Sequence, residues 1–61
     1  MFTNYKARYL KTGEVFERTF RESAAQQQTD RYGRLDELDA LRIINQWNRQ
    51  NVSAGFVYWI E

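Results

Sequence analysis

The chain has 61 residues and contains no cysteine, histidine or proline. This length allows one domain, and the lack of Cys and His excludes a disulfide framework and the usual zinc sites. The formal net charge of +1 gives no strong overall attraction to nucleic acid or to a membrane. Because no apolar run approaches the length of a membrane span, we predict a single soluble, cytoplasmic domain over residues 1–61 with no membrane partner.

Alternating aromatic residues on both sides of a glycine predict a β-hairpin at the start of the chain. Tyr5 and Tyr9 precede the turn segment 11–14, and Phe16 and Phe20 follow it. Because alternate residues of a strand share one face, these four rings would lie on the same face of the hairpin. A face of this kind is built to be covered by another element.

The register of the hairpin follows from which side chains pair well across the two strands. We predict the register in which paired residue numbers sum to 25, because a sum of 24 would set Lys6 opposite Arg18 and scatter the rings. The predicted pairs are Tyr9 with Phe16, Tyr5 with Phe20, and Arg8 with Glu17.

The segment after the hairpin has two interpretations. Ser23 and Gln26 fit a capping box, which predicts a short helix at about 23–32 that ends at Gly33 in the left-handed conformation. The apolar content of this segment is low, so an irregular loop is the other interpretation.

The clearest helix in the sequence runs from about 36 to 50. Asp36 is placed to cap its N-terminus, and Asn51 suits a left-handed residue just past its end, with Val52 touching Trp47 as in a Schellman motif. One stripe of this helix is apolar and should pack on the hairpin. The residues of that stripe are Ala40, Ile43, Ile44 and Trp47.

A second ridge lies beside the apolar stripe of the helix and widens it. It consists of Leu38, Leu41, Asn45 and Asn48, which we call the helix ridge. In one interpretation the segment before the helix folds back over Leu38 and Leu41. In the other, a partner or a twofold-related helix lies on the ridge, and the two asparagines set its register by hydrogen bonds.

The composition of residues 56–60 predicts a last strand that is apolar on both faces. Paired antiparallel with the first strand, it completes an α+β fold (ββαβ), in which a three-stranded antiparallel sheet of order 2-1-3 packs on one main helix. This strand would lie at a sheet edge without proline or internal charge. It is therefore a candidate for pairing with a second copy across a dimer axis.

We place Phe56, Tyr58 and Ile60 toward the helix, and the exchange of the two faces of this strand is the alternative. In either arrangement the opposite face of the sheet keeps large apolar groups among charges. Exposed aromatic and Arg side chains dominate the energetics of interfaces, so we predict that this face binds a partner. Its candidate partner-binding residues are Lys6, Arg8, Leu10, Val15, Val57 and Trp59.

Nucleic-acid binding is the alternative use of that face, with Trp59 stacking on a base while Lys6 and Arg8 hold phosphates. Glu17 beside this basic pair and the near-neutral net charge argue against it. A second basic group could contact phosphate or an acidic partner, or could pair with neighbouring carboxylates. It consists of Arg21, Arg31 and Arg34.

A catalytic function is disfavoured because His and Cys, the commonest base and the strongest nucleophile, are absent. The acidic group of Asp30, Asp36, Glu37 and Asp39 could hold Mg²⁺, but helix capping and the helix dipole explain three of its members. We predict no enzymatic activity, no metal and no cofactor.

The sequence therefore predicts a non-enzymatic protein-interaction module whose partner is another protein, with a second copy of the chain as one candidate. In its size and its density of aromatic residues it resembles small proteins of phages and mobile elements, which often bind and inhibit one host protein. A small RNA- or DNA-binding domain is the alternative.

Overall fold

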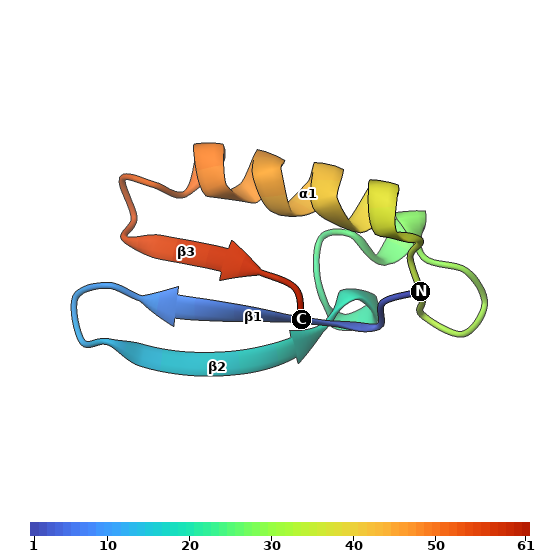
Figure 1. Cartoon of the computed structure of the whole chain (residues 1–61), viewed down its shortest axis with the longest axis horizontal. Coiled ribbons are helices and arrows are strands. Elements are labelled where there is room, and N and C mark those ends of the chain that lie inside the picture. The colour runs from blue at the N-terminus through green and yellow to red at the C-terminus, as the bar shows by residue number, and fades with distance from the viewer.

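The computed structural model describes all 61 residues and has the predicted α+β fold. Strand β1 lies between β2 and β3, and helix α1 runs along β3 on the side away from β2 (Figure 1). The elements are β1 (Asn4–Tyr9), β2 (Glu14–Thr19), the 3₁₀ turns η1 (Phe20–Glu22) and η2 (Gln26–Gln28), α1 (Glu37–Gln50) and β3 (Phe56–Trp59).

The hairpin register differs by two residues from the prediction. The residue numbers of each β1–β2 pair sum to 23, so that Tyr5 faces Arg18 and Ala7 faces Phe16. The cause is Gly13, which has a φ of 76° and closes a loop over residues 10–13. Only glycine adopts this conformation freely, and its place at the end of the loop decides where pairing begins. Because the error is an even number, each side chain keeps its predicted face.

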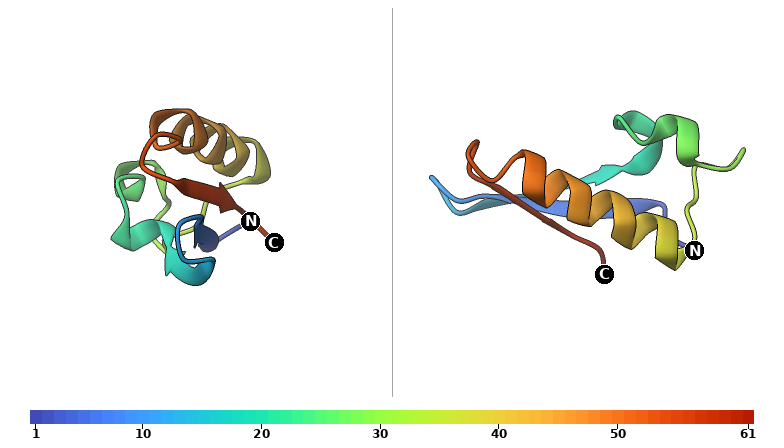
Figure 2. Two further views of the ribbon diagram at one scale, coloured as in Figure 1. Left: turned by 90° about the vertical axis from the view of Figure 1, so that its left-hand side faces the viewer. Right: turned by 90° about the horizontal axis from the view of Figure 1, so that it is seen from above.

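The core lies where the N-terminal half of β1 meets α1 and the segment between β2 and α1 (Figure 2). Phe20 is fully buried, and the ring of Tyr5 lies 5.2 Å from that of Phe20 and 4.9 Å from that of Trp47, between ring centroids. The hairpin reaches beyond the end of α1 (Figure 1), and Phe16 near its loop is only half-buried. The buried core consists of Tyr5, Phe20, Ala25, Leu35, Ala40, Ile43 and Ile44.

Residues 23–32 contain one short 3₁₀ turn, η2, and not the short α-helix that was one interpretation of this segment, and a further turn, η1, precedes them. The capping box is formed by Thr19 and Glu22, whose carboxylate accepts from the backbone N–H of Thr19, and not by Ser23 and Gln26. The Ser23 hydroxyl instead donates to the carbonyl of Phe20 at 2.8 Å. The chain therefore begins to turn as soon as β2 ends, which directs Phe20 into the core.

The loop before α1 is organised by one carboxylate. Oδ1 of Asp30 accepts from the backbone N–H groups of Tyr32 at 2.8 Å and Arg34 at 2.9 Å, and its Oδ2 accepts from Nε of Arg34 at 3.0 Å. Leu35 then pairs with Phe2 through two backbone hydrogen bonds of 2.7 and 2.8 Å. This bridge fastens the N-terminal segment to the start of the helix.

We expect Gly33→Ala to destabilise the protein more than Gly13→Ala. Both glycines have a φ of 76°, so each alanine carries a backbone cost of about 1–2 kcal/mol. A Cβ at Gly33 would also lie 2.9 Å from Nε of Arg21, whereas nothing lies within 4 Å of a Cβ at Gly13. Urea denaturation of the two variants measures the difference, and equal losses would contradict the contact with Arg21.

Helix α1 begins as predicted, because the Asp36 carboxylate caps it by accepting from the backbone N–H of Asp39 at 2.8 Å. Its end differs from the prediction. Asn51 has a φ of −111° and is not left-handed, and its side-chain amide donates to the carbonyl of Trp47 at 3.1 Å. The left-handed residue is Gly55, with a φ of 84°, and Val52 is 68% exposed. A longer turn over residues 51–55 thus leads into β3, and the Schellman motif is absent.

Candidate functional site on the open face of the sheet

The predicted partner-binding residues gather on one face of the sheet. In the two registers Arg8 lies between Val15 and Val57, while Lys6 lies between Glu17 and Trp59. The predicted pairing of Arg8 with Glu17 is therefore wrong, as a consequence of the shifted register. We call this surface the open face, consisting of Lys6, Arg8, Leu10, Val15, Glu17, Val57 and Trp59.

The centre of the open face is a shallow apolar hollow of about 340 Å³, lined by Arg8, Leu10, Val57 and Trp59. Leu10 and Val57 are 57% and 41% exposed. Trp59 is only half-buried: the guanidinium carbon of Arg8 lies 6.0 Å from its ring centroid, and its indole N–H donates to Glu61 at 3.3 Å. The tryptophan is thus held in place beside two exposed aliphatic groups.

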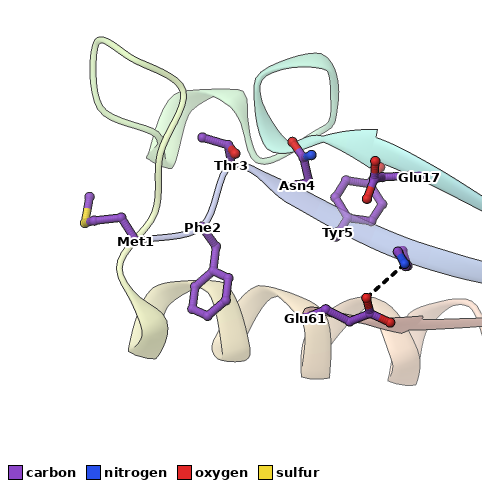
Figure 3. Close-up of a pocket in the computed structure, with 8 residues that line it drawn as sticks. Met1, Phe2, Thr3, Asn4, Tyr5, Glu17 and Glu61 are labelled. Carbon is purple, nitrogen blue, oxygen red and sulfur yellow. Dashed lines mark hydrogen bonds and ion pairs between the residues drawn. The ribbon is translucent and has the colours of Figure 1, made fainter.

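One end of the open face is polar and has its charges paired. The ammonium of Lys6 donates to Glu61 at 2.9 Å, and Glu17 lies across the strand pair from Lys6. These three side chains line a second hollow with the N-terminal residues (Figure 3), where Glu61 reaches from the C-terminal segment toward β1. Lys6 is therefore already engaged by the carboxylate of Glu61. Glu61 was not among the predicted site residues, because a contact between residues 55 positions apart leaves no local signal in the sequence.

The pairing with Lys6 should be measurable as an acid titration of Glu61. The hydrogen bond from Lys6, and a weaker contribution from Trp59, lower the pKa of the Glu61 side chain from its ordinary value of 4.5. The contribution of this contact to stability is therefore present above pH 4.5 and is lost as the pH falls through the lowered pKa. We expect ¹³C NMR of the Glu61 side-chain carboxyl to show a midpoint below 4.5 that rises in Lys6→Met. An unchanged midpoint in that variant would contradict the assignment.

The helix ridge is only partly a free surface. Leu38 and Leu41 are 74% and 39% exposed, so the segment before α1 does not fold back over them. Asn45 is also exposed. Asn48 instead donates through Nδ2 to the carbonyl of Tyr58 at 3.0 Å and accepts through Oδ1 from the N–H of Tyr58 at 2.7 Å. The predicted role of Asn48 in setting the register of a partner helix is therefore wrong, since its amide is used within the chain.

The same two hydrogen bonds cap the outer edge of β3. Tyr58 offers its backbone N–H and C=O to Asn48 and not to β1, so both groups point to the side of β3 that has no neighbouring strand. Exposed edge strands need protection of this kind against unwanted pairing. Pairing of β3 with a second copy, as the sequence suggested, would require both bonds to break.

The three arginines of the second basic group have contacts within the chain. Arg21 donates to the carbonyl of Arg31 at 2.9 Å, and Arg34 forms an ion pair with Asp30 at 3.0 Å. The guanidinium carbons of Arg31 and Arg34 lie 5.8 and 4.8 Å from the ring centroid of Tyr32, which is 61% exposed. Arg34 therefore pairs with a neighbouring carboxylate, which was one of the two interpretations of this basic group. The other was contact with phosphate or an acidic partner.

No group of three or more Asp and Glu side chains lies close enough to hold a metal ion. Asp30 organises its loop and Asp36 caps the helix, which accounts for two of the four acidic candidates. None of the helices has the length and apolar content that crossing a membrane requires.

The fold and this face define a small α+β protein with a half-apolar sheet surface. Comparisons of the chain with protein-family models, with curated proteins and with solved structures gave no match.

Proposed function

We propose that this protein is a non-enzymatic interaction module that binds another protein through its open face. The observation that carries the proposal is the apolar hollow at Arg8, Leu10, Val57 and Trp59, flanked by Val15, which is 45% exposed. Burying these groups against a partner would remove apolar surface from water. A small inhibitor of one host protein is the form of this function that the sequence suggested.

Two further features support this use of the face. Aromatic and Arg side chains contribute most to binding when they are central in an interface, and Trp59 and Arg8 both line the hollow that would form the centre of this one. Both have contacts in the free protein, Arg8 with the Trp59 ring and Trp59 with Glu61. Ordering them on binding therefore costs little side-chain entropy.

The experiment is affinity capture with the immobilised protein, followed by calorimetry with the purified partner. Val57→Lys places a charge in the hollow, and Leu38→Lys places the same charge on the helix ridge as a matched control. We expect Val57→Lys to weaken binding by about 1–3 kcal/mol, the range of a substantial interface residue, and Leu38→Lys to leave it unchanged. The reverse pattern would move the interface to the ridge and contradict the proposal.

Nucleic-acid binding is the second candidate, favoured by the Arg8 guanidinium beside the Trp59 ring. The engagement of Lys6 by Glu61 weighs against it, because it leaves Arg8 as the only cation of the face not paired with a carboxylate. Titration of labelled single and double strands at low and moderate salt decides between the two functions, since phosphate contacts make affinity fall steeply with salt. We expect no binding at either salt concentration.

A further inference from the structure

The outer edge of β2 is the unprotected edge of this sheet. Phe20 N–H donates to the carbonyl of Thr3, a pair that continues the register of β1 with β2, so the residues of β2 with even numbers direct their backbone groups toward β1. Backbone groups alternate in direction along a strand. The N–H and C=O groups of Val15 and Glu17 therefore point outward, away from β1, and no backbone or side-chain hydrogen bond engages them.

Both faces of β2 are lightly covered as well. Val15 is 45% exposed, Glu17 and Arg18 are exposed, and Phe16 is half-buried. Helix α1 lies on the far side of the sheet, and no other element runs beside β2 (Figure 1). The strand contains neither proline nor lysine, and its three charged residues, Glu14, Glu17 and Arg18, carry both signs, so they can pair with those of an antiparallel copy instead of repelling it. One edge of the sheet is thus capped by Asn48 and the other is open.

We propose that β2 pairs antiparallel with β2 of a second copy, which joins the two sheets into one of six strands. Outward-pointing residues must lie opposite each other, so paired residue numbers must have an even sum. A sum of 32 sets Phe16 opposite its own copy on the twofold axis and Glu14 opposite Arg18 of the partner, twice. Val15 then faces Glu17 of the partner, and these residues exchange about four backbone hydrogen bonds.

The neighbouring registers either bring like charges together or lose the ion pairs. The charges therefore favour the register with a sum of 32. A sum of 34 sets Glu17 opposite its own copy, and a sum of 36 does the same with Arg18, so that like charges meet. A sum of 30 brings Glu14 opposite Phe16 and loses both ion pairs. The strand is thus self-complementary in a single register.

This interface lies at the outer edge of β2, where Val15 and Glu17 form the border of the open face, and it leaves the hollow of Arg8, Leu10, Val57 and Trp59 accessible on both copies. It therefore goes beyond the proposed function, and each can fail without the other. The contact is one strand long, which places it among small interfaces, and we expect a dissociation constant on the order of 10–100 µM.

Charge reversal tests the register directly. We expect sedimentation equilibrium between about 10 µM and 1 mM to show the mass rising from monomer to dimer. Glu14→Arg and Arg18→Glu should each weaken dimerisation about tenfold or more, because two attractive pairs become repulsive. The double variant Glu14→Arg/Arg18→Glu restores opposite charges and should recover the wild-type constant to within about threefold.

Hydrogen exchange in the same samples provides a second readout. The amides of Val15 and Glu17 should gain protection at the higher concentration. Asn45→Asp serves as a control, since it changes one charge on the exposed side of α1, and it should leave the constant unchanged. A monomer at 1 mM, a dimer indifferent to the reversals, or one that dissociates in Val57→Lys alone would overturn the proposal.

Discussion

Replacing Phe20 with alanine is expected to remove a large part of the free energy that keeps the protein folded at 25 °C. The side chain is the largest of those that are fully buried, and truncating a buried Phe costs about 3–5 kcal/mol. A domain of this size has a total stability of about 3–9 kcal/mol, so the loss takes a large part of it. Circular dichroism with urea titration measures both the folded fraction and the change in the free energy of unfolding.

The position of Phe20 also explains why truncating its side chain should destabilise the whole fold and not one element. Its ring contacts Tyr5 from β1 and lies 6.2 Å from that of Trp47 on α1, between centroids, so it joins the sheet to the helix. Tyr32→Ala is the matched control, because that aromatic side chain is 61% exposed. A Phe20→Ala variant as stable as the Tyr32→Ala variant would show that the core is not centred on this ring.

Asn48→Ala is expected to destabilise the protein by about 1–3 kcal/mol and to raise its tendency to self-associate. The substitution removes both hydrogen bonds to Tyr58 and leaves its backbone N–H and C=O without partners at a partly buried edge. Unpaired strand edges are templates for pairing with another chain. Urea denaturation measures the first effect, and light scattering against concentration measures the second.

Asn45→Ala provides the same substitution one turn earlier on α1, at an exposed position. Alanine is a better helix former than asparagine, so this variant should be unchanged or slightly more stable. Equal effects of the two substitutions would mean that Asn48 acts through helix propensity and not through the edge of β3. Asn48→Asp separates the two bonds, since a carboxylate still accepts from the N–H of Tyr58 but cannot donate to its carbonyl.

The two edges of the sheet differ in whether the chain itself satisfies their backbone groups, and this difference explains which edge is proposed to bind a second copy. One edge is closed within the chain by Asn48, and the other offers the backbone groups of Val15 and Glu17. A dimer joined through β2 would carry two copies of the open face on the same side, because rotation about an axis normal to a sheet keeps its faces. Binding of a partner with two matching sites would then gain from effective concentration.

The strands, the main helix and the face on which each of their residues lies could be predicted from local patterns, whereas the 3₁₀ turns after β2 could not. Aromatic residues at every second position predicted the strands. The apolar stripe of Ala40, Ile43 and Ile44 predicted the buried side of α1, and Asp36 predicted where this helix begins. These properties depend on local spacing and on backbone geometry that repeats, so they can be read without knowing what the chain folds against. The composition of the open face followed, since alternation assigns each residue of a strand to one face or the other.

The register, the course of the connections and the partners of the polar groups depend on contacts that local patterns do not reveal. The register depended on the left-handed Gly13, and the path after β2 depended on Thr19 and Glu22 capping one turn before the predicted site. Asn48 and Glu61 contact residues that are distant in sequence or belong to another element, and side chains of their kind are usually solvated. Their hydrogen bonds form because packing brings α1 and the C-terminal segment beside particular strands. Local sequence patterns do not predict which strands these will be.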